Sequence, residues 1–331
     1  MIYLETSDSN QDNSNEITQN ITEESEVEST RIEPPYKGFT WQVVLMIAII
    51  VLAWSTPNII GRYLQVNSAI TPIQISSLRY VPAALTLLIF CLITRRGKQL
   101  LLDFKEKYIH LIIASLILTS FVLLQMYSVK FTEASASAFL LNVNPVITFI
   151  LSLIILKERH RWWGSIGILI AATGIFFVAV PLNDIENLIS SDLLLGNILA
   201  FLSGVAWAIY TVYLKKFLKE KDPVTTTTWN LSISAIILTI TMFAVDGWFA
   251  TTPAFYHIIL TTFLGIVPTA IAFTLWFETL KQIAVQKASA FQFLIPVIAT
   301  LFALAMGETI DLFFGFGGGL ILIGLIITQT S

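Results

Sequence analysis

The chain has 331 residues, of which 55% are hydrophobic and 12% are charged, and its mean hydropathy is +0.77. These values exclude an ordinary soluble globular protein and indicate an integral membrane protein. The net charge of −3 is uninformative because acids and bases are segregated along the chain, and the single cysteine, Cys91, excludes intramolecular disulfides and thiolate metal clusters.

The first 38 residues differ in composition from the rest of the chain. Residues 1–38 are polar and acidic and are rich in Ser, Thr, Asn and Glu. Such a segment has too few large apolar side chains to offset the entropy that is lost on ordering. We therefore expect residues 1–38 to form a disordered acidic tail on the cytosolic side.

Ten apolar runs of roughly 18 to 24 residues follow the tail, separated by short polar joints. Each run is long enough to cross about 30 Å of hydrocarbon as a helix, and none shows the alternation that is typical of barrel strands. The sequence therefore predicts an all-α polytopic membrane protein with ten transmembrane helices. The expected spans are 41–63, 72–93, 108–130, 135–156, 162–181, 194–214, 226–245, 256–279, 284–306 and 313–330.

The basic residues of the joints predict the orientation of these helices. Lys and Arg concentrate in alternate joints, as in 95–107 and 215–221, whereas the joint 182–193 carries three acids and no base. Because basic joints stay on the cytosolic side, both termini are expected in the cytosol. The expected location is a multi-pass protein of the inner (plasma) membrane.

Residues 133–174 return in degraded form at residues 283–324. Each copy opens with small residues, carries a proline within an apolar run and ends that run at an acid, after which two glycines follow at the same offsets. This pattern indicates an internal duplication. The matching residues are Pro145 and Pro296, Glu158 and Glu308, Gly167 and Gly317, and Gly174 and Gly324.

Further correspondences extend the duplication to both halves of the chain. Ala53-Trp54 matches Ala206-Trp207, and Lys130 matches Lys281, so each half is expected to hold five helices. Because five is odd, the second copy enters the membrane from the opposite side, which gives inverted-topology repeats. Such repeats suit alternating access around a site between the two halves.

Short motifs recur in chain order at equivalent places of the two halves. They are Trp54-Ser-Thr-Pro-Asn58, Leu78-Arg79, Pro145 and Leu156-Lys-Glu158 in the first half, and Ala206-Trp207, Pro296 and Gly307-Glu308 in the second. With these motifs, residues 41–330 resemble the EamA-type members of the drug/metabolite transporter superfamily. The resemblance implies two five-helix repeats, at 39–181 and 194–331, and a secondary transporter, often an exporter of amino acids, metabolites or drugs.

Aromatic and amide side chains form the first candidate site. Trp54 and Asn58 are expected one turn apart on one helix, and Trp207 with Tyr210 repeats that geometry in the second half. We expect them to line a central cavity, in which rings hold the apolar part of a substrate and amides its polar part. The alternative is that Trp207 is a packing residue and that Asn58 bonds a neighbouring helix.

Two amide side chains precede the repeated prolines. Asn142 lies three residues before Pro145, and Gln292 lies four residues before Pro296. A proline removes a helical hydrogen bond, so these amides either satisfy the broken backbone or line the substrate path near the midplane, and the two roles are compatible. A gating or structural role is expected for both prolines.

Arg79 is the one clearly intramembrane base of the predicted spans. A charged side chain at this depth is a candidate for a functional role. The alternative is that the Arg79 side chain extends to the outer interface or bonds the carbonyls at a helix end. A gating or structural role is favoured over direct substrate contact, because the second half has the uncharged Asn230 at the matching place. Glu278 is expected to pair with Lys281, three residues on, so it is not a candidate for proton coupling.

These observations predict a carrier that exports or exchanges small metabolites such as amino acids by alternating access. The expected lining is poor in charge, which favours a neutral or zwitterionic substrate. A drug or lipid translocator of the same fold and a passive channel are the alternatives. No enzyme activity, cofactor or metal site is expected, because no cluster of nucleophile, base or metal ligands is visible. The expected partners are a small-molecule substrate and membrane lipids, without nucleic acid, and a monomer and a homodimer are both open.

Overall fold

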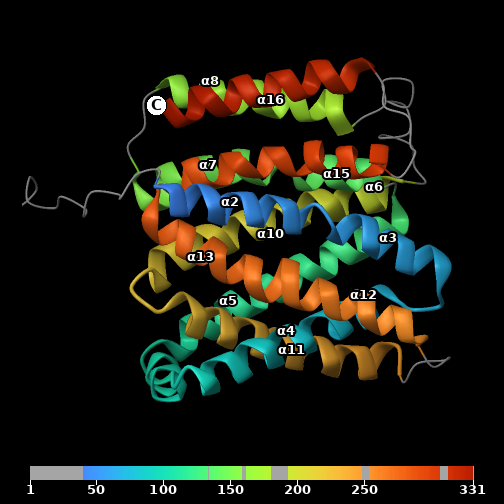
Figure 1. The fold of residues 1–331 in the computed structure, drawn as a ribbon, viewed down its shortest axis with the longest axis vertical. Helices are drawn as coiled ribbons and strands as arrows, with labels where there is room; N and C mark the ends of the chain where they lie inside the picture. Colours follow the sequence, from blue (N-terminus) through green and yellow to red (C-terminus); the bar gives the residue numbers. More distant parts are fainter. Residues whose placement is uncertain are drawn as a thin grey trace, which may run out of the picture. The chain divides into compact units, whose positions relative to one another are not determined.

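Helices make up nearly all of the chain that the computed structural model describes, namely residues 40–132, 134–158, 162–179, 193–247, 253–305 and 312–330 (Figure 1). No strand occurs in these ranges, so the prediction of an all-α protein is confirmed for them. The acidic tail and Glu308 lie outside the described residues. The elements of the first half are α2 (Trp41–Trp54), α3 (Pro57–Asn67), α4 (Pro72–Ile93), α5 (Gly97–Phe131), α6 (Ala134–Leu141), α7 (Asn144–Leu151), η1 (Ser152–Leu156) and α8 (Trp162–Ala179).

The second half repeats this order of long and broken helices. Its elements are α10 (Leu194–Leu218), α11 (Pro223–Val245), α12 (Phe255–Gly265), η3 (Ile266–Ile271), α13 (Ala272–Gln282), α14 (Val285–Ala290), η4 (Phe291–Phe293), α15 (Leu294–Ala305) and α16 (Leu312–Thr330). The elements η1 and η3 are π-helical, and η4 is a 3₁₀ turn.

Within the residues that the structure describes, seven helical stretches are long and apolar enough to cross a membrane. Three further apolar helices, within 162–177, 285–299 and 315–330, are shorter. Seven of the ten expected spans are therefore matched in length and composition, and the other three coincide with the shorter helices. The seven are Trp41–Asn67, Pro72–Ile93, Gly97–Phe131, Phe139–Leu156, Leu194–Leu218, Pro223–Val245 and Phe255–Gln282.

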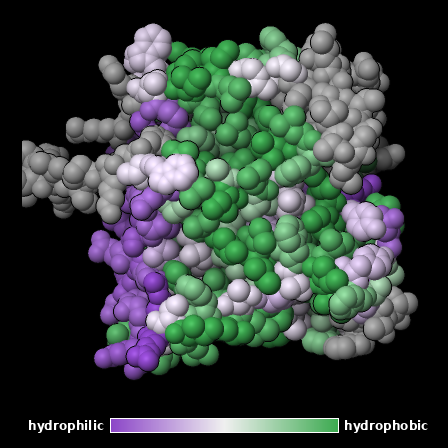
Figure 2. Space-filling model, in the orientation of Figure 1, coloured by the Kyte–Doolittle hydropathy of each residue, from purple (hydrophilic) through white to green (hydrophobic). Residues whose placement is uncertain are grey.

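Apolar side chains cover much of the surface, as expected for a protein in contact with lipid. Figure 2 shows a broad hydrophobic face, with hydrophilic residues gathered along one edge. Large apolar side chains such as Leu92, Ile93 and Phe255 are more than two-thirds exposed. Together with the apolar helices, this surface supports a multi-pass membrane protein.

Two helices begin earlier than the hydropathy predicts. α5 starts at Gly97, because a more polar segment before the expected span is also helical and joins it through a bend at Lys107 (φ −130°, ψ 20°). α11 starts at Pro223, where the Asp222 side chain accepts a 3.0 Å hydrogen bond from the Thr225 N–H and so caps the helix. Local capping therefore sets this start, which hydropathy does not record.

Three prolines interrupt apolar spans, and a side chain next to each one compensates for the missing donor. A proline has no N–H, so the carbonyl four residues earlier loses its helical partner. The result is a break between α2 and α3, another between α6 and α7, and the π-helical turn η3. The three bonds are Thr56 Oγ1 to Ala53 O (2.8 Å), Asn144 Nδ2 to Leu141 O (3.1 Å) and Thr269 Oγ1 to Leu264 O (2.7 Å), which serve Pro57, Pro145 and Pro268.

Helices α4 and α11, which are second in their respective halves, pack against each other in opposite directions. Ser77, near the start of α4, contacts Thr239, late in α11, with 2.9 Å between the hydroxyl oxygens. At the other end of the pair, Cys91 Sγ lies 3.4 Å from Thr228 Oγ1. The two contacts fix an antiparallel arrangement of equivalent helices.

Helices α8 and α16, the fifth of each half, form a second antiparallel pair (Figure 1). A Cβ atom added to Gly167 would lie 2.6 Å from the Gly324 oxygen, and one added to Gly174 would lie 2.6 Å from the Gly317 oxygen. The main chains therefore approach too closely for any side chain at these positions. The glycines that repeat in the sequence thus meet each other across one interface.

Candidate functional site

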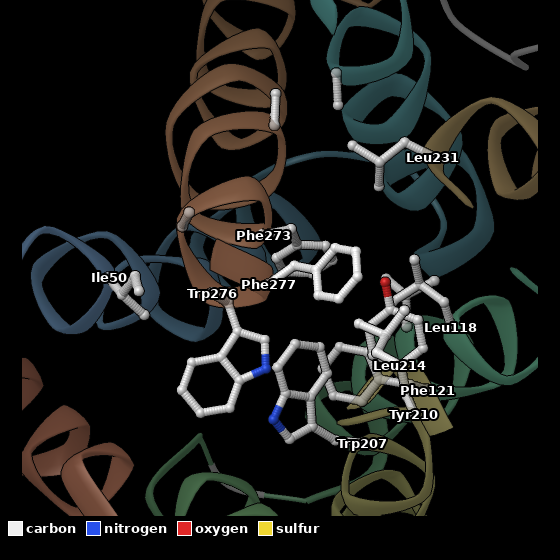
Figure 3. Close-up of a cluster of buried hydrophobic side chains, with 14 of the residues drawn as sticks. Ile50, Leu118, Phe121, Trp207, Tyr210, Leu214, Leu231, Phe273, Trp276 and Phe277 are labelled. Carbon is white, nitrogen blue, oxygen red and sulfur yellow. The ribbon is translucent and has the colours of Figure 1, made fainter. Parts of the chain in front are cut away.

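Six aromatic side chains from four helices meet in the interior, and we call them the aromatic cluster. The Trp54 ring lies 5.0 Å from the Trp207 ring at an interplanar angle of 88°, and 5.3 Å from the Trp276 ring. Figure 3 shows the indoles of Trp207 and Trp276 facing each other. Edge-to-face and tilted pairs of this kind are the favoured aromatic geometries. The cluster consists of Trp54 (α2), Phe121 (α5), Trp207 and Tyr210 (α10), and Phe273 and Trp276 (α13).

Trp54 connects the aromatic cluster to the π-helical turn η3. Its indole Nε1 donates a 3.0 Å hydrogen bond to the main-chain oxygen of Pro268. The turn exists because Pro268 interrupts the α12–α13 helix, and π-helical segments of this kind occur often at functional sites. Trp54, a candidate from the sequence, therefore lies where the first half of the chain contacts the second.

Trp207 is held by Gln292, the amide that precedes Pro296. The Trp207 Nε1 donates to the Gln292 Oε1 at 3.0 Å, and both side chains are about 3% exposed. The Gln292 Nε2 and the Trp276 Nε1 are buried and have no hydrogen-bond partner among the described residues. Buried donors of this type normally have partners, so they identify a place where a hydrogen-bond acceptor would be stabilised.

Asn142 lies in the turn between α6 and α7, and it is 3% exposed. This turn packs on α10 at Gly204, where an added Cβ atom would lie 2.6 Å from the Leu141 oxygen. Gly204 precedes Trp207 by one helical turn, so the broken helix is held close to the aromatic cluster. The structure thus places the turn that carries Asn142 against α10, one helical turn from Trp207, and contact of Asn142 with a substrate stays a prediction.

Asn58 and Tyr210 bond neighbouring helices. The Asn58 Oδ1 accepts a 3.1 Å hydrogen bond from the Gln125 Nε2 of α5, because the break before Pro57 separates Asn58 from the helix of Trp54. Tyr210 keeps its ring in the aromatic cluster, 5.5 Å from that of Trp207, and its hydroxyl accepts a 3.1 Å bond from Asn230. The structure therefore brings Trp54, Trp207, Tyr210 and Gln292 together, and it joins Asn58 to α5 through Gln125.

Arg79 lies inside the helix bundle, where it is 2% exposed. Its Nε donates a 2.6 Å hydrogen bond to the Thr269 hydroxyl, which in turn donates to the Leu264 oxygen. The guanidinium carbon lies 5.7 Å from the centre of the Tyr80 ring. The alternative in which the side chain reaches the interface is therefore wrong.

The two repeated prolines stand at the start of helices. Pro145 is the second residue of α7, and Pro296 is in the first turn of α15 after the 3₁₀ turn η4. Each half thus has a helix that breaks just before its proline, beside the candidate amides Asn142 and Gln292. A gating or structural role for Pro145 and Pro296 stays a prediction.

The predicted pair between Glu278 and Lys281 is not formed. Glu278 accepts a 2.6 Å hydrogen bond from Gln282, four residues on, and the Lys281 Nζ donates to the main-chain oxygen of Lys221 at 3.1 Å. Lys281 reaches Lys221 because the α10–α11 joint lies next to the end of α13. A tertiary contact has displaced the local pair that helical spacing suggested.

The joint between α10 and α11 carries the main ionic contacts of the described part of the chain. Lys221 binds Glu106, and its Nζ lies 3.3 Å from the Asp103 carboxylate. The hydrogen bond to Glu106 raises the pKa of Lys221 above its ordinary value of 10.5, against a smaller opposing effect of burial. Arg96 pairs with Asp222 at 2.5 Å, so this end of α4, α5 and α11 is tied together by charge.

Residues that the sequence did not single out complete the site, and all of them except Phe121 lie in the second half. None has an aromatic or hydroxyl equivalent in the other half, so the internal repeat could not reveal them. Two signals were available: Phe273 and Trp276 are one turn apart on α13, and Pro268 lies inside an apolar span. The missed residues are Phe121, Pro268, Thr269, Phe273 and Trp276.

Comparison with known proteins identifies the family. The family model described as "EamA-like transporter family" matches residues 41–180 and, again, residues 194–330. The matches thus cover most of the chain and occur once in each half. They agree with the resemblance that the repeated motifs indicate.

Curated relatives and a solved structure agree with this match. The uncharacterized transporter YyaM of Bacillus subtilis is 26% identical over 262 residues, which are 77% of this chain and 84% of that protein. An uncharacterized transporter of Clostridium kluyveri is 25% identical over 289 residues, which are 87% and 93% of the two chains. A crystal structure with 17% identity has a TM-score of 0.72 over 86% of this chain and 96% of that one, so the fold is shared. The chain belongs to the EamA-like transporter family.

Proposed function

We propose that this protein is a secondary carrier which exports or exchanges small metabolites, such as amino acids, by alternating access. It acts as a transporter rather than as an enzyme, in the inner (plasma) membrane with both termini in the cytosol. The two repeats, 39–181 and 194–331, each contribute five membrane-spanning helices, and the second repeat is inverted relative to the first. Family membership supports transport, and the details that follow support the mechanism.

The antiparallel pairing of equivalent helices supports inverted repeats. A two-fold axis in the membrane plane turns each helix of one repeat over onto its equivalent in the other, so paired equivalents run antiparallel. Both α4 with α11 and α8 with α16 have this relation. The three shorter apolar helices supply the spans that complete five in each repeat.

The aromatic cluster is the observation that carries the proposal of a central substrate site. Its members come from both repeats, and they are adjacent to buried donors on Trp276 and Gln292 that lack partners in the described residues. Aromatic walls with a few polar groups are typical of sites for small organic molecules. The rings pack against one another, so entry of a substrate among them requires them to separate.

Counterflow in proteoliposomes tests the proposal. Vesicles are preloaded with unlabelled amino acids and common metabolites, traces of labelled compounds are added outside, and the accumulated compounds are identified by mass spectrometry. A carrier accumulates label against its gradient because its loaded site returns, whereas a channel only equilibrates it. We expect accumulation of at least one compound that saturates as its concentration is raised.

Two tryptophan variants separate the site from general stability. Trp54→Ala removes a ring of the aromatic cluster and is expected to reduce counterflow at least tenfold. Trp41→Ala makes the same change at the first residue of α2, where the side chain is 73% exposed, and should leave counterflow unchanged. Equal rates in the two variants would refute the proposed site, and equilibration without accumulation would refute the carrier in favour of a channel.

A further inference from the structure

Arg79 is a buried charge without a buried counter-charge. It forms no ion pair with any residue that the structure describes, and its Nη1 has no hydrogen-bond partner there. Its one hydrogen bond, from Nε to Thr269, is to a neutral hydroxyl. Isolated buried charges are strongly unfavourable, and proteins almost always pair them.

A hydroxyl beside Arg79 is also without a partner. The Tyr80 Oη is buried, and none of the described residues bonds it. A guanidinium N–H and a phenolic O–H are both able to donate to the same oxygen group. This part of α4 therefore offers hydrogen-bond donors and one positive charge, and the group that they would stabilise is an anionic oxygen.

Arg79 and the aromatic cluster are connected through consecutive residues of η3. Arg79 bonds the Thr269 hydroxyl, and Trp54 bonds the main-chain oxygen of Pro268. The Cα atoms of adjacent residues are about 3.8 Å apart, so the cationic group and the aromatic cluster are both held against the same short turn. A molecule with an apolar body and an anionic end can reach both.

We propose that Arg79 is a specificity-determining residue of the substrate site, where it binds the carboxylate of a solute whose apolar body lies among the rings of the aromatic cluster. The proposal rests on the proposed function and adds the substrate class to it. It also gives Arg79 direct contact with the substrate, the less favoured of the two roles that the sequence suggested.

A carboxylate matches the charge of this site better than a phosphate group does. A single guanidinium balances a single negative charge, and its planar fork fits the two carboxylate oxygens. A phosphate ester carries nearly two charges and calls for several Lys or Arg side chains. In the absence of substrate, the Thr269 hydroxyl and the Tyr80 ring hold the guanidinium in position.

Thermal unfolding of the purified full chain in detergent tests the proposal with matched pairs of probes. The pairs are acetate and acetamide, benzoate and benzamide, and 3-phenylpropanoate and 3-phenylpropanamide, each titrated at neutral pH. The members of a pair have nearly the same shape and differ in charge. We expect 3-phenylpropanoate to bind about tenfold more tightly than its amide, as a charge-assisted bond replaces a neutral one.

Three variants assign the effect to Arg79. Arg79→Gln should abolish the preference for the carboxylate, and Arg79→Lys should keep the preference but bind severalfold more weakly, because the fork is lost. Arg62→Gln makes the same neutralising change on α3, where Arg62 bonds the Val129 oxygen, and should keep the full preference. If Arg79→Gln does not fold, the severalfold weakening in Arg79→Lys is the deciding measurement.

Two results would overturn the proposal. One is that no carboxylate of the series binds the wild-type protein more tightly than its amide, and the other is that Arg79→Gln or Arg79→Lys binds the carboxylate as the wild type does. Failure of the proposed function is a separate result, because counterflow measures exchange and thermal unfolding measures binding. A protein that shows counterflow but no preference for the carboxylate would keep the carrier and lose the carboxylate site.

Discussion

Trp54 and Pro268 are 214 positions apart in the chain and are joined by a 3.0 Å hydrogen bond from the indole Nε1 to the main-chain oxygen. The bond links the end of α2 to η3, the π-helical turn in which Pro268 leaves the Leu264 oxygen without its helical donor. The contact crosses between the two family-matched segments. A movement of the two repeats relative to each other would therefore strain or break this hydrogen bond.

Trp54→Phe keeps an aromatic ring and removes the donor of this bond. We expect the free energy of unfolding to fall by about 1 kcal/mol, the usual contribution of one hydrogen bond, and substrate affinity to fall less than in Trp54→Ala. Unfolding in mixed micelles and the concentration dependence of counterflow measure the two effects. Trp41→Phe is the matched control, and a Trp54→Phe protein as stable as this control would show that the bond contributes nothing.

Thr269→Val tests the hydroxyl that connects Arg79 to the backbone. The change leaves the Leu264 oxygen and the Arg79 Nε without this partner, so we expect a loss of about 1–3 kcal/mol in the free energy of unfolding. Thr269→Ser keeps the hydroxyl and should be close to wild type. Thr274→Val removes a hydroxyl that bonds only the Ala270 oxygen of its own helix, and a loss as large in this control would contradict the prediction.

The helices could be predicted from the sequence because each one depends on a long apolar run. The exact ends of the helices could not be predicted from hydropathy, because they depend on single side chains. Asp222 caps the start of α11, and Thr56 with Pro57 separates α3 from α2. Hydropathy averages over such residues. The start of α5 at Gly97 was missed because the segment before the expected span is polar and is nevertheless helical.

The candidate site could be anticipated only where the two repeats share a residue type. The sequence predicted Trp54 and Trp207 because they are tryptophans at equivalent positions of the two repeats. Trp276 and Thr269 have no such counterpart, and their role depends on contacts between distant parts of the chain. Asn58 was expected on the same helix as Trp54, but a break before Pro57 separates the two helices, and the Asn58 side chain bonds Gln125.

Gly324→Ala tests the close approach of α8 and α16. An added Cβ atom would lie 2.5 Å from the Ala171 nitrogen on the facing backbone, so the two helices must separate. Overpacking of this kind typically costs about 1–3 kcal/mol, measured again by unfolding in mixed micelles. Gly319→Ala is the control on the same helix, because nothing lies within 4 Å of its added Cβ atom, and equal stability of the two variants would refute the close approach.

Stability at alkaline pH should depend on Lys221. Its pKa is raised in the folded protein, mainly by the hydrogen bond to Glu106, so the protonated form is bound more tightly than in the unfolded chain. The contribution is therefore full below the unfolded pKa of about 10.5 and is lost as the pH rises through the higher folded value. We expect the melting temperature of Lys221→Met to fall less than that of the wild type above this pH. Lys98→Met, at the start of α5, is the control, and a wild-type decline as shallow as that of Lys221→Met would contradict the assignment.

Glu158 joins the end of the fourth span to the start of the ninth. Its Oε1 accepts a 3.1 Å hydrogen bond from the N–H of Val285, the first residue of α14, where a negative charge also favours the helix dipole. The contact lies between the two repeats, at the end of the bundle that is predicted to face the cytosol. Under alternating access, this end must open in part of the cycle, and loss of the contact should favour the open state.

Glu158→Ala is therefore expected to expose the start of α14. A cysteine at Gln286, which is 4% exposed, reports the opening through its rate of reaction with a maleimide in a protein whose native Cys91 has been changed to alanine. We expect severalfold faster labelling with Glu158→Ala and an intermediate rate with Glu158→Gln, which keeps an acceptor and loses the charge. Glu106→Ala removes an exposed carboxylate of α5 that pairs with Lys221, and it should leave the rate unchanged. Unchanged labelling in Glu158→Ala would contradict this prediction. It would mean that contacts other than the hydrogen bond to Val285 keep this end of the bundle closed.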